Sequence, residues 1–507
     1  MKISASAAAA TILLARDALN SAALITQETT TSQILETPFL GQHVGLSIFD
    51  INNDGAPDIL FASGRHWVDQ SYALVNLGPK YKENGDFEGI RFSEALPIGP
   101  PGGYYQIDVA PMLQTTSSDE ATHHTMVLLV GGTCHYETPN QFGSCVKGDN
   151  TPGRLLEVGV SGCSIQTPDE ECKLTWDLVW ENQNPRGDRN GGFAYFQDAV
   201  HPSIALLGQG GVEIYHHPYQ QEFEFRIPAP EKIDPRSDFG RYAGFASSKT
   251  LLGGAIAAGR RSDYDPPQID SKGRVERLNL LVYEDQQSST SSAFETYFLP
   301  SNISGEPYPG NNSISIQSTN FQFDDIDGDG VDDLLEATFL YTSQRVSGHP
   351  LPQRIHFLNE KGHVKNTLVV HDSEEGDAGR SVTTGQIFSD SDLPDVVFAS
   401  AKGIVTVFAN LGIDEFGAFR GLEQRYKFSA KNPQCQVRDV AVARMAQSDD
   451  DNQCWIGLVA AVACPFEKPT PKFLGENEIF YIKGSCANGN SSTILRIDDW
   501  EGQAKVE

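Results

Sequence analysis

Short hydrophobic runs, separated by clusters of Gly, Pro, Asn and Asp, recur along most of the chain. The runs are rich in Val, Ile, Leu and Phe, which is typical of buried strands bounded by turns. Beyond the N-terminal region no stretch keeps the 3.6-residue apolar period of an amphipathic helix. We therefore expect an all-β protein. The clearest predicted strands are Asp58–Ser63, Thr125–Val130, Ser203–Leu207, Val212–Tyr215, Asn279–Tyr283, Asp395–Ser400 and Ile404–Phe408.

One structural unit repeats in degraded form along the sequence. It begins with Gly or an aromatic residue and a first strand, continues through an acidic loop into a second strand, and ends after a third strand at Asn or Gly. Repetition of such a unit is the signature of a β-propeller. We predict a single closed propeller of seven four-stranded blades with Cys-containing insertions, and leave six or eight blades open. The clear copies are Gly45–Gly78, Asn320–Asn359 and Gly379–Gly412, and weaker copies begin near Gly102, Gly191, Gly240 and Cys435.

Two acidic loops carry the strongest chemical signal. Oxygen-bearing side chains alternate in both loops, a Gly follows that permits a tight turn, and an Asp closes each set. Calcium takes six to eight oxygen ligands, many of them carboxylates, so this spacing predicts two calcium sites. The side chains are Asp50, Asn52, Asp54 and Asp58 in the first loop, and Asp325, Asp327, Asp329 and Asp333 in the second.

The segments DINNDGAPDILFAS, which begins at Asp50, and DIDGDGVDDLLEATF, which begins at Asp325, resemble FG-GAP repeats, also called VCBS-type repeats. Such repeats build the propeller of integrin α subunits and of many secreted proteins. The resemblance is partial in Gly379–Gly412 and extends only as a pattern over about residues 39–500. It implies that loop positions 1, 3, 5 and 9 bind calcium through side chains. It also implies that position 7, here Ala56 and Val331, binds through its carbonyl.

Two further interpretations of acidic segments have less support than the two calcium loops: an EF-hand in the second loop, and a third calcium site. The second loop also fits the EF-hand expression with Glu336 twelfth, but an EF-hand needs flanking helices and the flanks here have the pattern of strands. Phe61 holds the twelfth place in the first loop and offers no ligand. A third, shorter loop keeps acidic residues but lacks Asp-Gly, so we expect a weak calcium site or none there. Its residues are Asp390, Asp392 and Asp395.

Composition narrows the class of protein. The 507 residues include 67 acidic and 38 basic ones, for a formal charge of −29, which argues against a nucleic-acid or anionic-membrane binder. Residues 1–23 have the pattern of a secretory signal peptide, with an organelle presequence as the alternative. No later stretch is long and apolar enough for a transmembrane helix. We expect an extracellular protein with an N-terminal segment over 24–38, the propeller over 39–500 and a tail over 501–507.

The eight cysteines fall into two groups of four, which suits disulfide bonds in a secreted protein. We expect neighbours to pair within each group, and the absence of CxxC argues against zinc. Sequons at Asn302, Asn311 and Asn490 permit glycosylation. The cysteines are Cys134, Cys145, Cys163 and Cys172, then Cys435, Cys454, Cys464 and Cys486.

Basic and aromatic residues gather in the loops expected on the face opposite the acidic loops. Arg and aromatic side chains suit an anionic or polar ligand such as a carboxylate-bearing sugar. The alternative is that Arg and His in these loops bond neighbouring backbone carbonyls or pair with surface Asp. The paired residues His123–His124 and His216–His217 lack a third metal ligand, and we assign them to strand edges or loops. The ligand-binding candidates are Arg65, His66, Trp67, Tyr104, Tyr105, His135, Arg241, Arg260, Arg261 and Arg380.

Two functions fit these observations, because a propeller does not by itself specify an activity. The first is a calcium-stabilised recognition or adhesion module for a glycan or an extracellular protein. The alternative is a carbohydrate lyase or dehydratase, in which Arg neutralises a carboxylate and His or Tyr transfers a proton. Its catalytic candidates are Arg65, His66, Tyr104, Tyr105 and Arg260.

Overall fold

The structure is a computed structural model in which every regular element of the described residues is a β-strand, β1 to β30. The all-β prediction is therefore confirmed for this part of the chain, which also contains no helix able to cross a bilayer. The predicted signal peptide, the C-terminal tail and all three sequons lie outside it. The structure describes residues 31–35, 45–64, 68–114, 122–132, 149–183, 185, 190–196, 201–208, 211–219, 225–228, 242–248, 250–251, 254–262, 278–283, 294–298, 314–342, 353–370, 379–431, 435–447, 453–464 and 477–485.

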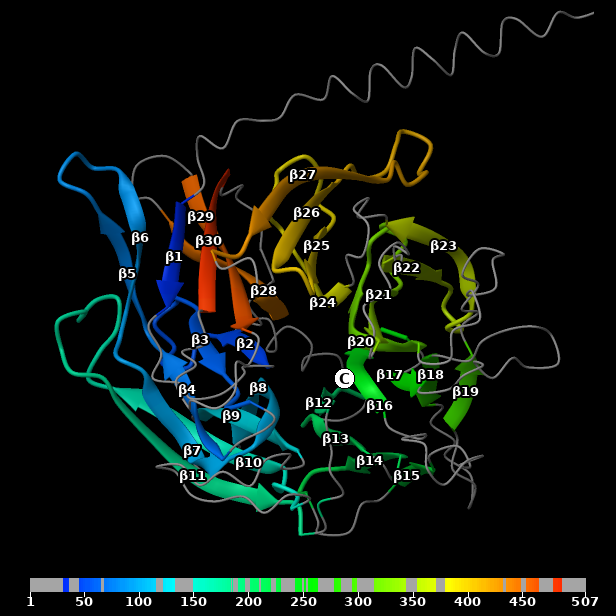
Figure 1. The fold of residues 1–507 in the computed structure, drawn as a ribbon, viewed down its shortest axis with the longest axis horizontal. Helices are drawn as coiled ribbons and strands as arrows, with labels where there is room; N and C mark the ends of the chain where they lie inside the picture. The colour runs from blue at the N-terminus through cyan, green and yellow to red at the C-terminus, as the bar shows by residue number, and fades with distance from the viewer. Residues whose placement is uncertain are drawn as a thin grey trace, which may run out of the picture.

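The strands form antiparallel sheets arranged around a central axis like the blades of a propeller (Figure 1). Five sheets have four strands each, and a hairpin of β5 (Asn76–Tyr81) and β6 (Phe87–Phe92) is inserted between β4 and β7. The sheets contain β2 (Leu46–Phe49), β3 (Asp58–Phe61), β4 (Asp69–Leu74) and β7 (Leu96–Gly102); β8 (Tyr104–Gln114), β9 (Thr122–Gly131), β10 (Arg154–Ser161) and β11 (Lys173–Glu181); β12 (Asn190–Ala194), β13 (Ser203–Gly208), β14 (Gly211–Tyr215) and β15 (Phe225–Pro228); β24 (Gly379–Gly385), β25 (Asp395–Ser400), β26 (Ile404–Asn410) and β27 (Leu422–Ser429); and β28 (Gln436–Gln447), β29 (Gln453–Ala463), β30 (Asn477–Ser485) and β1 (Thr31–Leu35).

The sixth sheet has eight strands and corrects the predicted number of blades. All seven predicted units form strands, but two of them are hydrogen-bonded into one sheet, so the described residues form six blade sheets instead of seven. Strand β17 extends beyond its pairing with β18, and its residues Arg261 and Ser262 pair with Gln317 and Ile316 of β20. Such a contact between units depends on their placement in space, which a repeat count does not reveal. The strands are β16 (Tyr242–Ser248), β17 (Ala255–Ser262), β18 (Leu278–Tyr283), β19 (Phe294–Phe298), β20 (Ile314–Asp324), β21 (Asp333–Thr342), β22 (Gln353–Leu358) and β23 (Val364–Val370).

The N-terminal strand closes the ring. Strand β1 pairs with β30 and becomes the outer strand of the sheet that the C-terminal strands form (Figure 1). It precedes residue 39, the predicted start of the propeller. The Gln33 side chain accepts the Tyr481 hydroxyl at 2.7 Å and donates to the Ile90 carbonyl at 3.0 Å. The Phe87 ring stacks on Trp455 with centroids 3.9 Å apart, so the β5–β6 hairpin also packs against the closing sheet.

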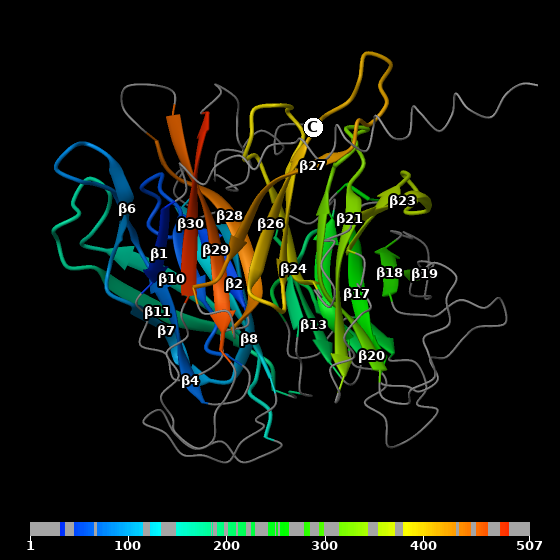
Figure 2. The same ribbon diagram turned by 45° about the horizontal axis from the view of Figure 1, so that its top comes forward.

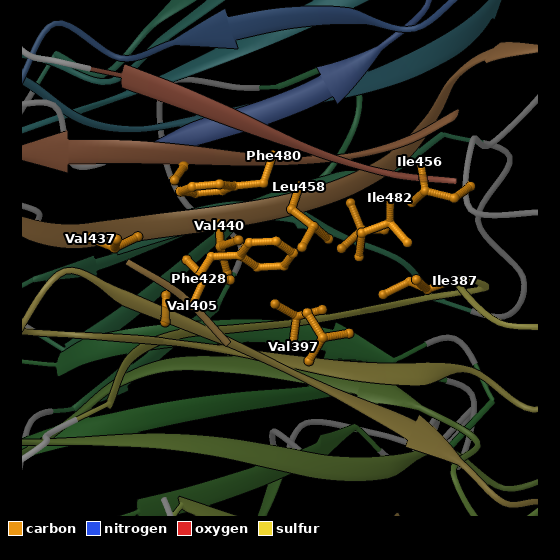
Figure 3. Packing of buried hydrophobic residues seen from close by; sticks show 14 of the residues in the cluster. Ile387, Val397, Val405, Phe428, Val437, Val440, Ile456, Leu458, Phe480 and Ile482 are labelled. Carbon is orange, nitrogen blue, oxygen red and sulfur yellow. The ribbon is translucent and has the colours of Figure 1, made fainter. Parts of the chain in front are cut away.

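The hydrophobic core lies between neighbouring sheets. Successive residues of a strand point to opposite faces, so one strand serves two interfaces. In β25, Val397 and Ala399 pack toward the closing sheet, whereas Val396 and Phe398 pack toward β20–β23. Figure 3 shows Val397 facing Leu458 across the first of these interfaces. Because both faces of such a strand are buried, the sequence runs that form these strands are almost continuously apolar.

Two disulfide bonds test the predicted pairing. Cys163–Cys172 joins neighbours in the β10–β11 hairpin, which confirms the prediction for that pair. Cys435 bonds to Cys464 instead of to its neighbour Cys454, so the neighbour pairing is wrong there. The antiparallel register places the first residue of β28 opposite the last residue of β29, and the two cysteines that flank these residues meet. Cys454, near the start of β29, is also disulfide-bonded.

Candidate functional site

Both acidic loops connect the first and second strands of their units. The first joins β2 to β3 and the second joins β20 to β21, so strands flank each loop. Glu336 lies within β21 and is buried, where its carboxylate contacts His356 and Arg354. The EF-hand interpretation is therefore excluded, as the sequence indicated.

In the second loop three carboxylates converge. One oxygen from each of Asp325, Asp327 and Asp333 lies within 4.8 Å of the others. The Asp325 carboxylate accepts the backbone N–H groups of Gly328 and Gly330, each at 2.8 Å, which fixes its orientation. The Oδ1 atom of Asp327 is buried and has no hydrogen-bond partner. Since Gly330 has a φ of +83°, a side chain there would strain the turn that brings these groups together.

The second loop already attracts a positive charge. The Lys365 ammonium lies 3.5 Å from Asp327 Oδ2 and also contacts the Asp329 carboxylate. Burial, reinforced by repulsion from Asp329, raises the pKa of Asp327. Burial also raises the pKa of Asp333 to about 7. Ionising all these carboxylates together is unfavourable without a cation, and a divalent ion would remove that cost.

The first loop has the same arrangement of oxygen-bearing side chains, but Asn52 replaces one aspartate, so the loop carries one negative charge fewer. The Asp50 carboxylate accepts the N–H of Asp54 at 3.1 Å and that of Gly55 at 2.8 Å. Asn52 donates through Nδ2 to Asp54 at 3.0 Å, and its Oδ1 is buried without a partner. Asn52 and Asp327 hold the same loop position, so both loops present an unpartnered oxygen at position 3.

A hairpin from the neighbouring sheet covers the first loop. The N–H of Ile165 donates to Asp54 Oδ2 at 2.8 Å, and Asn52 Nδ2 lies 3.4 Å from the Cys163 carbonyl. The Cys163–Cys172 bond closes this β10–β11 hairpin. More than one hundred residues separate the two segments in the chain, so only the fold shows that the disulfide-closed hairpin lies against the first loop.

Closing aspartates recur as the first residue of three second strands. Each carboxylate accepts a backbone N–H from its own loop and another from the last residue of the third strand or from just beyond it, at 2.7–3.1 Å. These residues therefore tie three strands together, whether or not a metal is bound. The contacts are Asp58 with Ile51 and Asn76, Asp333 with Ile326 and Leu358, and Asp395 with Ile387 and Asn410.

The third acidic loop differs from the first two. Asp390 forms an ion pair with Arg425 at 2.8 Å, and Asp392 is exposed. Burial raises the pKa of Asp395 to about 6, and its carboxylate is occupied by backbone N–H donors. The loop thus offers fewer available oxygens than the other two.

The candidate ligand residues are only partly described. Tyr104 is buried, its hydroxyl donates to the Pro100 carbonyl at 3.3 Å, and it accepts a hydrogen bond from Arg154. Tyr105 is also buried, and Arg380 donates to the Gln436 side chain at 3.2 Å. Tyr104 and Tyr105 lie on β8 and Arg380 on β24, in separate sheets. Of the remaining candidates, Arg260 and Arg261 belong to β17 with side chains outside the described part, and Arg65, His66, Trp67, His135 and Arg241 lie wholly outside it.

Two histidines lie side by side that the sequence did not predict as a pair. The rings of His201 and His217 lie 4.2 Å apart between centroids, and His201 Nδ1 is buried without a hydrogen-bond partner. Burial lowers the pKa of both imidazoles. His216 contacts Ser203 Oγ at 2.7 Å instead. The sequence grouped His216 with His217 because they are adjacent, whereas the β13–β14 register brings His201 to His217.

The sheet arrangement defines the protein as a β-propeller. No protein-family model matches the chain, and no curated protein matches it. Among solved structures it is similar to the crystal structure of the Saccharomyces cerevisiae Sqt1, with 9% identity over 89% of this chain and 98% of that one, at a TM-score of 0.41. It is also similar to the Dos1 propeller, with 8% identity over 89% and 94% of the two chains, at a TM-score of 0.35.

Proposed function

We propose that the protein is a secreted, calcium-stabilised β-propeller that recognises an extracellular protein or glycan. The observation that carries the proposal is the second acidic loop, where oxygens of Asp325, Asp327 and Asp333 converge and Asp327 Oδ1 has no partner. Calcium prefers such a set of hard oxygen ligands. The resemblance of both loops to FG-GAP repeats supports the same ion.

Bound calcium would neutralise the crowded carboxylates and tie the loop between the first two strands. The third loop has weaker support as a site because Arg425 already pairs with Asp390. The proposed ligands are Asp50, Asn52, Asp54, Asp58 and the Ala56 carbonyl in the first loop, and Asp325, Asp327, Asp329, Asp333 and the Val331 carbonyl in the second.

Exposed apolar side chains beside the acidic loops favour a protein partner. Ile165 is 37%, Ile413 47% and Phe416 86% exposed, and all three lie on connections between third and fourth strands. Antiparallel strands alternate in direction, so these connections are on the same face as the acidic loops. Ile413 lies beside Gly328 of the second loop, and Figure 2 shows the β26–β27 connection projecting from this face. The lyase or dehydratase alternative has no comparable support in the described residues, since Tyr104 is buried and its hydroxyl is engaged.

Calcium titration of chelator-treated protein tests the two proposed calcium sites. We expect about two calcium ions per chain, and stabilisation of about 2.7 kcal/mol when free calcium is 100 times Kd. Asp327→Ala should abolish binding at the second loop and Asn52→Ala should weaken binding at the first. Asp392→Ala, which changes an exposed carboxylate of the third loop, is the matched control and should leave both sites intact. Absence of binding heat, together with an unfolding midpoint unchanged by chelator, would refute the calcium assignment.

A binding screen tests recognition separately. Wild-type protein is applied to arrays of extracellular proteins and of glycans, with calcium and with EDTA. We expect calcium-dependent retention by a protein ligand, and at least about tenfold weaker binding for Phe416→Ser, as for an exposed aromatic anchor. Val369→Ser changes an exposed apolar residue on the outer strand β23 and should not alter binding. A wild-type chain that retains no ligand on either array would count against the recognition function.

A further inference from the structure

The sheet β12–β15 contains a loop equivalent to the acidic loops, but its sequence has Tyr, Gln, Ala and Ser at positions 1, 3, 5 and 9 in place of the carboxylates. Ser203 is the first residue of β13, as Asp58 and Asp333 are the first residues of β3 and β21. It also pairs with the last residue of the preceding strand, as both aspartates do. His201 therefore lies two residues before the closing position, at the place where the acidic loops offer a backbone carbonyl.

The second histidine comes from the end of the third strand of the same sheet. Tyr215 of β14 pairs with Ile204, as His356 of β22 pairs with Leu334 in the second acidic unit. Two residues further on, His217 thus holds the place of Leu358, whose N–H binds the closing aspartate. His201 thus stands at loop position 7 and His217 beside the closing position, although the two lie sixteen positions apart in the chain.

We propose that His201 and His217 form a binding site for a borderline divalent metal ion such as Zn²⁺ or Cu²⁺. Imidazole nitrogens suit these metals, whereas calcium prefers oxygen. The ring centroids are 4.2 Å apart, and the buried His201 Nδ1 has no hydrogen-bond partner, so a ligand nitrogen is available. His217 is exposed and gives the ion access, with water completing the coordination.

Neighbouring contacts hold the pair in place. The Tyr219 hydroxyl donates to the Pro202 carbonyl at 2.9 Å, which joins the two loops beside the histidines. The Tyr219 ring also packs edge-on against His217 with centroids 5.3 Å apart. His216 is directed elsewhere, toward Ser203 and the Phe196 ring. The site is independent of the calcium proposal because it shares no ligand with either acidic loop.

Zn²⁺ titration in the presence of saturating calcium, which occupies the acidic loops, tests the site. We expect about one Zn²⁺ per chain at neutral pH, bound at least about tenfold more weakly after His201→Ala or His217→Ala. His216→Ala is the matched control because it removes an adjacent imidazole that the site does not use. His217→Asn provides a conservative variant, since Asn410 fills the equivalent place in β24–β27.

The Cu²⁺ electron paramagnetic resonance spectrum gives a second readout that folding alone does not change. Two nitrogen ligands are expected in the wild type and in His216→Ala, and one after His217→Asn. Thermal unfolding without Zn²⁺ or Cu²⁺ identifies variants that fail to fold. Equal Zn²⁺ affinity in all variants, no binding by the wild type, or an unchanged nitrogen count in His217→Asn would overturn the proposal.

Discussion

A chain that begins at residue 36, and so lacks β1, is expected to lose roughly 3–6 kcal/mol of unfolding free energy. Removing β1 leaves the edge of β30 unpaired and exposes its hydrogen-bonding groups. Burial of Leu35, which is 3% exposed, contributes about 1.5–3 kcal/mol by itself. The hydrogen bonds of Gln33 with Tyr481 and Ile90 are lost as well. Urea denaturation measures the difference.

The matched control is a chain that begins at residue 31 and retains β1. It should be as stable as the full chain, because the strand that closes the ring is intact. A synthetic peptide of residues 28–38 added to the shortened chain should restore part of the stability, and the same peptide with Gln33→Ala should restore less. Equal stability of the chains that begin at residues 31 and 36 would show that β1 does not close the propeller energetically.

Replacing the buried Glu336 by Ala is expected to lower the free energy of unfolding by about 3–5 kcal/mol, because the buried Arg354 guanidinium loses its carboxylate partner. Glu336, Arg354 and His356 are 2%, 3% and 1% exposed. Glu336 Oε2 lies 3.1 Å from His356 Nε2 and 3.8 Å from the Arg354 guanidinium. His356 Nδ1 is 3.1 Å from the Thr367 hydroxyl, which completes a network across β21, β22 and β23.

Urea denaturation also measures this change, with the exposed Glu360 as the matched position. Glu360→Ala should alter the free energy of unfolding by no more than about 0.5 kcal/mol. Glu336→Gln keeps the shape and some hydrogen bonding but not the charge. Its loss in free energy of unfolding should lie between those of Glu336→Ala and Glu360→Ala. If Glu336→Ala destabilised the protein no more than Glu360→Ala does, the buried network would not be a stability element.

The proposed location of recognition differs from the one that the sequence suggested. The sequence directed attention to basic and aromatic loops on the face opposite the acidic loops. In the described residues, Ile165 and Ile413 instead expose apolar surface beside the acidic loops, and Phe416 is exposed on the same connection as Ile413. Exposed apolar surface gathered on one face of a protein is typical of protein-interaction sites. Under the proposed function, calcium would shape the same face that binds the partner.

The sequence determined the local features of this protein. Strand positions followed from short apolar runs and turn residues, because a strand buried between two sheets needs apolar side chains on both faces. The alternating acidic residues and the Gly at position 6 defined two loops with available oxygens, since the spacing lies within nine residues of chain. The Cys163–Cys172 bond could likewise be predicted from proximity along the chain.

Tertiary structure decided the features that join distant segments. The eight-stranded sheet, the closing role of β1, the Cys435–Cys464 bond and the His201–His217 pair all depend on strand register or on packing between units. A sequence pattern shows which residues of one segment form a strand and which of its faces are buried. It does not show which segment lies opposite, because that choice results from closing the whole ring.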